Sequence, residues 1–123
     1  MIDYDNIDYK FIKKRLLDFL EINKSFYFKV YKTNNGYHVF IMSHLFSHND
    51  KNTVRLLKLL ACDSWYILFS YNSGFKIRLN SKLSHSHSKI HEFIEYLGDS
   101  KYLLDICNNY DNIIHQKIKI YNL

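Results

Sequence analysis

Two aspartates near the start of the chain and one histidine further along are the residues whose types and spacing favour chemistry. The stretch "IDYD" places Asp3 and Asp5 two residues apart, and alternate residues of a β-strand point to the same side. If this stretch is a strand, two carboxylates share one face, and their oxygens suit a divalent cation such as Mg²⁺ or Mn²⁺. His38 lies in "YKTNNGYHVF", just beyond an Asn-Gly turn. A site that uses all three residues requires a fold that brings His38 beside the aspartates.

Local signals predict the elements that would hold these residues. A short strand at 2–4 precedes a helix that Asn6 or Asp8 caps and that ends near Asn23. The segments that follow alternate in polarity, which predicts two strands. They are residues 25–32 and 37–43, joined in a hairpin that turns at Asn35 and Gly36, since Asn and Gly tolerate the positive φ of hairpin turns.

The second half of the chain is expected to add further helices and a second hairpin. The predicted elements are a helix capped by Asn49 or Asp50, a hairpin of residues 65–71 and 75–80, a helix from Ser88 to Leu97 stopped by Gly98, a short helix over 102–110 and a strand near 117–121. This order predicts an α+β fold with an RRM-like or ferredoxin-like antiparallel sheet, helices on one face and the other face free. We expect a single domain over 1–123, with a core at 1–80 and a mostly helical extension at 81–123.

Composition narrows the class of protein. The formal net charge of +5 and the pI near 9.1 favour a polyanionic partner, although lysine enrichment also follows from an AT-rich genome, as in a virus, organelle, protist or low-GC microbe. No apolar run approaches the roughly 20 residues that a membrane span needs. The polar N-terminus is unlike a signal peptide. We therefore expect an intracellular, soluble protein of the cytoplasm, a viral factory or an organelle matrix, with Cys62 and Cys107 buried and reduced.

The order of these motifs resembles the catalytic core of the archaeo-eukaryotic primase superfamily, which includes the primase-polymerases. That core is an RRM-like sheet with an Asp-x-Asp on its first strand and a histidine on a strand after a glycine-containing turn. Here "IDYD" supplies Asp3 and Asp5, and "KTNNGYHVF" puts Thr33, Gly36 and His38 at the matching places. The resemblance covers roughly residues 1–80.

The resemblance implies metal-dependent nucleotidyl transfer in DNA replication, with nucleic acid and nucleoside triphosphates as partners, in a larger nucleoprotein assembly. Asp3 and Asp5 would hold Mg²⁺ or Mn²⁺, which neutralises a triphosphate and activates a 3′ hydroxyl. His38 would contact the incoming phosphates. The other expected nucleotide or nucleic-acid contacts are Tyr31, Lys32, Thr33 and Arg78.

The family usually supplies a third carboxylate from a later strand. The segments 65–71 and 75–80 contain none, and Arg78 or Asn80 stands where it is expected. A site with two carboxylates predicts weak synthesis or none.

Two other functions fit the same sequence. The first is a non-catalytic nucleic-acid-binding module of a viral or organellar ribonucleoprotein, and the second is a structural or assembly protein whose charge reflects genome composition alone. Both leave Asp3 and Asp5 as acids ahead of a helix N-terminus and His38 as an ordinary hairpin residue. An exposed aromatic cluster beside Lys29 and Lys32 would favour binding by base stacking, whereas a buried one would only build the core; its members are Tyr27, Tyr31, Tyr37 and Phe40. The stretch "SHSHSKIH" offers either a metal-binding pair, His87 and His91, or a polar loop.

Overall fold

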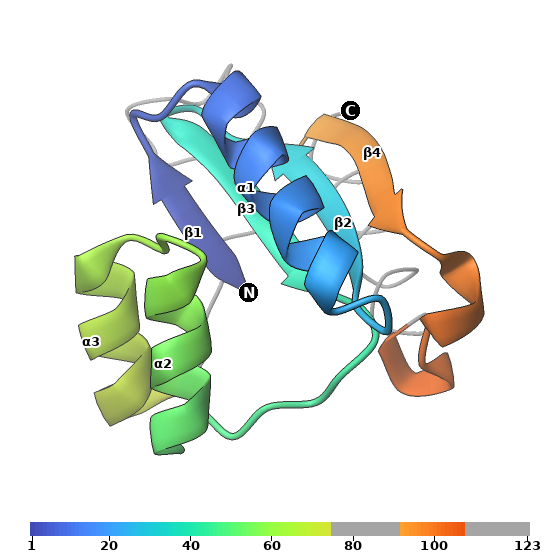
Figure 1. The fold of residues 1–123 in the computed structure, drawn as a ribbon. Coiled ribbons are helices and arrows are strands. Elements are labelled where there is room, and N and C mark those ends of the chain that lie inside the picture. Colours follow the sequence, from blue (N-terminus) through green and yellow to red (C-terminus); the bar gives the residue numbers. More distant parts are fainter. Residues whose placement is uncertain (75–91, 108–123) are drawn as a thin grey trace, which may run out of the picture.

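The computed structural model describes residues 1–74 and 92–107 and has the predicted α+β class, a four-stranded antiparallel sheet with helices packed against it (Figure 1). The elements are β1 (Ile2–Asp5), α1 (Tyr9–Ile22), β2 (Tyr27–Lys32), β3 (Gly36–Ile41), α2 (Lys51–Leu59), α3 (Ser64–Ser73), β4 (Glu92–Gly98) and a 3₁₀ turn, η2 (Ser100–Tyr102). The strand order is β1-β3-β2-β4. The first and third strands are therefore neighbours, as an RRM-like arrangement requires.

The predicted hairpin is confirmed. The Thr33 N–H donates to the Gly36 carbonyl at 2.9 Å and closes the turn between β2 and β3. Gly36 also lies against β1, where a Cβ atom added to it would come within 1.7 Å of the Tyr4 carbonyl oxygen. Only glycine permits this close approach of two backbones, so Gly36 lets β1 pair with β3 right up to the turn.

The first helix covers one face of the sheet. Asp8 caps α1 by accepting from the Lys10 N–H at 3.0 Å, and Asn23 ends the helix, both as predicted. Ile12 and Leu16 are buried against strand residues of the same face. The core continues beneath α2 and α3, which lie together beside β1 (Figure 1). Its fully or nearly buried strand and helix members include Ile2, Tyr4, Phe28, Val30, Val39, Ile41, Leu57, Leu60, Ile67 and Leu97.

The opposite face of the sheet is not free, contrary to expectation. Tyr27 and Met42 belong to a second apolar cluster, with Cys107 and other residues that follow β4. The Leu104 N–H donates to the Met42 carbonyl at 3.0 Å, which ties this segment to the end of β3. Lys29, fully buried, lies 5.1–5.2 Å from the centroids of three aromatic rings, those of Tyr31, Phe93 and Tyr96. Apolar and aromatic packing therefore covers this face around β2.

Two elements differ from the prediction. Residues 65–71 form α3 rather than a strand, because Asp63 caps this helix and a short apolar run has no periodicity that separates helix from strand. Residues 92–98 form β4 rather than the end of a helix, because they pair along the whole length of β2. The helical extension predicted for 81–123 is therefore wrong at 92–98. The expected elements at 75–80, 88–91 and 117–121 lie outside the described residues.

Candidate functional site

The sheet brings the first aspartate and the histidine together. Asp3 and His38 occupy directly opposed positions of β1 and β3, so their side chains project on the same face. The His38 Nε2 lies 3.2 Å from the Asp3 Oδ1, and each side chain is only 15% exposed. The convergence of Asp3, Asp5 and His38 that the strand pattern predicted is confirmed.

A third carboxylate joins this pair from outside the sheet. Asp63 lies between α2 and α3, and its N–H donates to the Asp3 carbonyl at 2.6 Å, while the Asp3 N–H donates to the Cys62 Sγ at 3.2 Å. These two hydrogen bonds hold the segment between α2 and α3 against the outer edge of β1. Carboxylate oxygens of Asp3, Asp5 and Asp63 lie within 4.8 Å of one another. The expectation of a site with only two carboxylates is therefore wrong.

The short segment between α2 and α3 that carries Asp63 contains a residue in the left-handed backbone conformation. Ala61 follows α2 with a φ of 59°, in the left-handed region that costs about 1–2 kcal/mol for a residue other than glycine. The Asp63 Oδ2 accepts from the Tyr66 N–H at 3.0 Å and caps α3. Asp63 thus has two roles, as helix cap and as member of the acidic cluster. The sequence signal for it was an Asp at a cap position in "ACDSW", which the strand prediction for 65–71 concealed.

The cluster is electrostatically strained. Partial burial raises the pKa of the Asp5 carboxyl, and the negative charges of Asp3 and Asp63 raise it further, while His38 acts in the opposite direction. The Asp3 Oδ1 is buried and accepts no hydrogen bond from any residue in the described ranges. Its approach to His38 is therefore an electrostatic contact. A cation bound among these oxygens would offset the repulsion between the carboxylates and would give the Asp3 Oδ1 a partner.

The residues fit a hard divalent cation. Mg²⁺ and Mn²⁺ take oxygen ligands, and Mg²⁺ typically binds through one or two carboxylates, with water and substrate phosphates completing its shell. Asp5 is exposed, so the cluster opens to solvent on that side. Cys62 borders the cluster but is a poor ligand, because burial raises its thiol pKa to about 12. Cys62 and Cys107 are both buried and free, as predicted.

Three of the other residues predicted to contact nucleotides or nucleic acid lie in the part of the chain that the structure describes, namely Tyr31, Lys32 and Thr33. Tyr31 pairs with His38 across the hairpin but is 1% exposed, so its ring is not accessible for stacking on a base. Lys32 is exposed and pairs with Tyr37, so it projects on the face opposite His38. Thr33 takes part in the hairpin turn. Arg78, like His87 and His91, lies outside the described residues.

The four residues of the predicted aromatic platform pack against other side chains on the two faces of the sheet. Tyr27 stacks on Tyr96 with ring centroids 5.3 Å apart, and the Phe40 ring meets Tyr31 edge-on at 5.6 Å. Tyr37 stacks on Tyr9 of α1 at 4.9 Å, on the other face. These rings stabilise the two sides of the sheet and do not form one exposed surface.

The chain matches no protein-family model, no curated protein and no solved structure. Within residues 1–74 and 92–107, no helix has the length and apolar character to cross a membrane.

Proposed function

We propose that this protein catalyses divalent-metal-dependent nucleotidyl transfer on nucleic acid. The observation that carries the proposal is the convergence of Asp3, Asp5 and Asp63, from two separate segments, beside His38. Support also comes from the basic charge of the chain and from the resemblance of "IDYD" and "KTNNGYHVF" to primase-polymerase motifs.

The residues divide into ligands and a phosphate contact. Asp5 and Asp63, with Asp3, would hold Mg²⁺ or Mn²⁺, which when bound supplies charge neutralisation at a triphosphate and activation of a hydroxyl nucleophile. His38, when protonated, donates a hydrogen bond to a phosphate oxygen. Asp3 orients the His38 ring through its 3.2 Å contact.

The acidic cluster favours an enzyme over a binding module. Without a cation, three carboxylates repel a phosphate backbone, so they are a disadvantage in a protein that only binds nucleic acid. A purely structural protein gains nothing from placing three like charges within 4.8 Å of one another. Phosphoryl-transfer sites combine such carboxylates with metal ions as a normal part of catalysis.

The test is template-directed synthesis by the purified full chain with Mg²⁺ or Mn²⁺, nucleoside triphosphates and a primed single-stranded template. We expect measurable extension, since the third carboxylate is present, and we expect Asp5→Asn to abolish it. Asp18→Asn is the matched control, because Asp18 is an exposed aspartate of α1 outside the cluster. Absence of extension with every nucleotide and metal, or extension unaffected by Asp5→Asn, would reject the proposal.

A further inference from the structure

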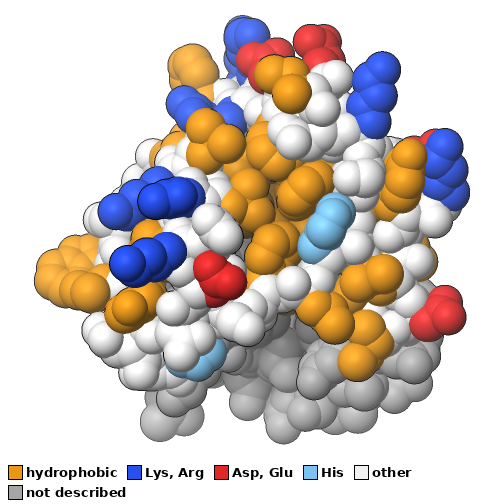
Figure 2. All heavy atoms as spheres, turned by 60° about the horizontal axis from the view of Figure 1, so that its bottom comes forward, with side chains coloured by type: hydrophobic (Ala, Val, Ile, Leu, Met, Phe, Trp, Pro, Cys, Tyr) orange, Lys and Arg blue, Asp and Glu red, His pale blue; other side chains and the backbone are white. Residues whose placement is uncertain are grey.

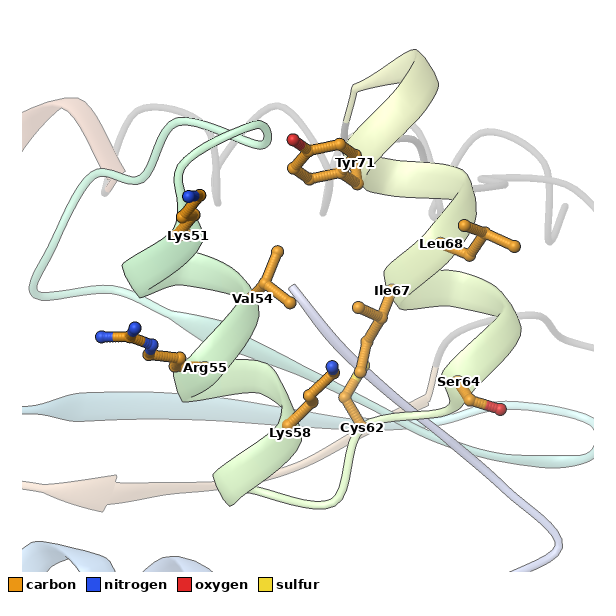
Figure 3. Close-up of a pocket in the computed structure, with 9 residues that line it drawn as sticks. All are labelled: Lys51, Val54, Arg55, Lys58, Cys62, Ser64, Ile67, Leu68 and Tyr71. Carbon is orange, nitrogen blue, oxygen red and sulfur yellow. The ribbon is translucent and has the colours of Figure 1, made fainter.

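A basic groove runs between the two helices that flank the acidic cluster. Its volume is about 560 Å³, and it lies between α2 and α3 (Figure 3). The α2 side carries Lys51, Arg55 and Lys58, and apolar side chains of both helices line the space between them. Figure 2 shows basic side chains gathered beside hydrophobic ones on the side of the molecule where these helices lie.

The three cations form a row along one helix. Their spacing of four and three residues puts them on one face of α2, and at 1.5 Å per residue the row extends about 10 Å. All three are exposed, and none forms an ion pair with another described residue. Like charges placed in a row without partners repel one another, so a linear anion along the row would stabilise them.

The rest of the groove suits bases rather than phosphates alone. Val54, Ile67 and Leu68 supply apolar surface, and the Tyr71 ring stands at the end of the groove near Lys51 (Figure 3). Tyr71 is 43% exposed, whereas Tyr4, Tyr27 and Tyr31 of the sheet are buried. A row of cations beside apolar surface and an accessible aromatic ring is the combination that single-stranded nucleic acid requires.

The groove also borders the acidic cluster. Cys62 and Ser64 line its other end, and Asp63 lies between them in the chain. We propose that this groove binds a single-stranded nucleic acid, with phosphates along Lys51, Arg55 and Lys58 and a base on Tyr71, and that the strand leads toward the carboxylates. This inference deepens the proposed function and relies on it for the direction of the strand, but binding itself needs no metal.

The test measures binding in EDTA by fluorescence anisotropy of a labelled oligothymidylate, so that it does not depend on catalysis. The variant is Lys51→Gln/Lys58→Gln, and the matched control is Lys10→Gln/Lys24→Gln, which removes the same charge at exposed positions outside the groove. Each phosphate contact to a single strand contributes about 0.7 to the slope of log K against log salt. Loss of two contacts should make this fall of log K with log salt less steep by about 1.4. Between 50 and 200 mM salt, the wild type should therefore lose about sevenfold more affinity than the groove variant.

The role of the Tyr71 ring is tested separately. Tyr71→Ala should weaken binding at least about fivefold with no change in the salt slope, because stacking contributes roughly 1–3 kcal/mol per base and involves no counterion. Circular dichroism of each variant verifies that it is folded.

Several results would overturn the assignment of the groove. They are equal effects of the groove variant and its control, no effect of Tyr71→Ala, or displacement of the oligonucleotide by poly-glutamate at equal concentration, which would indicate a generic anion site. Binding that follows the prediction in a protein without synthesis would reject the proposed enzyme and keep the groove. Synthesis by a protein whose binding does not follow the prediction would reject the groove and keep the enzyme.

Discussion

Replacing Asp5 by asparagine should change the stability of the protein in opposite directions with and without metal. The side chain keeps its size but loses its charge. Asp5 lies with Asp3 and Asp63 in a cluster whose oxygens are within 4.8 Å of one another. Two unit charges at this distance repel by about 0.9 kcal/mol in water and about 3.5 kcal/mol at an effective dielectric constant of 20.

The lower value applies best to Asp5, because this side chain is exposed and salt screens its interactions. Two repulsions of this size, partly offset by attraction to His38, leave a cost of about 1 kcal/mol in the metal-free protein. Asp5→Asn removes that cost. We therefore expect the variant to be more stable than the wild type in EDTA by about 1 kcal/mol, which raises the Tm by about 3–6 °C in a chain of this size.

Bound metal should make the wild type more stable than Asp5→Asn. A ligand at 100 times its Kd stabilises the folded state by about 2.7 kcal/mol, and the wild type should gain this from Mn²⁺ while Asp5→Asn gains far less. The wild type then exceeds the variant by about 1–2 kcal/mol. Thermal unfolding followed by circular dichroism, in EDTA and in a Mn²⁺ series, measures both differences. Asp18→Asn keeps the cluster and should gain the same stability from Mn²⁺ as the wild type.

The pH dependence in EDTA has a definite sign. The folded pKa of Asp5 is raised, so the unfolded chain loses this proton first and stability falls as pH rises from the ordinary aspartate pKa through the raised one. The advantage of Asp5→Asn should therefore be present near neutral pH and disappear in acid. The reasoning is refuted if Asp5→Asn destabilises the metal-free protein, or if Mn²⁺ raises the Tm of both proteins equally.

Two further substitutions test how the cluster is built. Asp63→Asn should keep the cap of α3, since asparagine caps as well as aspartate, and should lose the Mn²⁺ response. Asp63→Ala removes the same charge and also the cap, so in EDTA it should be about 1 kcal/mol less stable than Asp63→Asn. Urea unfolding of both variants separates the two roles, and equal stabilities for both would contradict the assignment. Gly36→Ala should destabilise the protein by more than about 2 kcal/mol, because its Cβ would lie 1.7 Å from the Tyr4 carbonyl oxygen. Since β1 must then move, the Mn²⁺ response should fall as well, and a normal Tm would show that β1 does not pack there.

Local signals in the sequence were enough to predict several parts of the fold. Asp8 and Asp50 cap the first two helices, and the turn at Asn35 and Gly36 reverses the chain. Each acts within a few residues, so its effect can be predicted without tertiary structure. Strand alternation also predicted that Asp3 and His38 share a face, because neighbouring strands fix which residues are opposed.

The residues that complete and surround the site depend on contacts between distant segments of the chain. Asp63 is far from Asp3 in the chain and reaches it through backbone bonds along the edge of β1. The strand at 92–98 exists because β2 offers it a partner, and the Phe93 ring of that strand packs edge-on against Tyr31. These outcomes depend on pairing and packing between distant segments, for which an apolar run such as "WYILFSY" carries no local signal. The third carboxylate, that of Asp63, belongs to a helix cap, and a backbone bond to Asp3 brings it to the site.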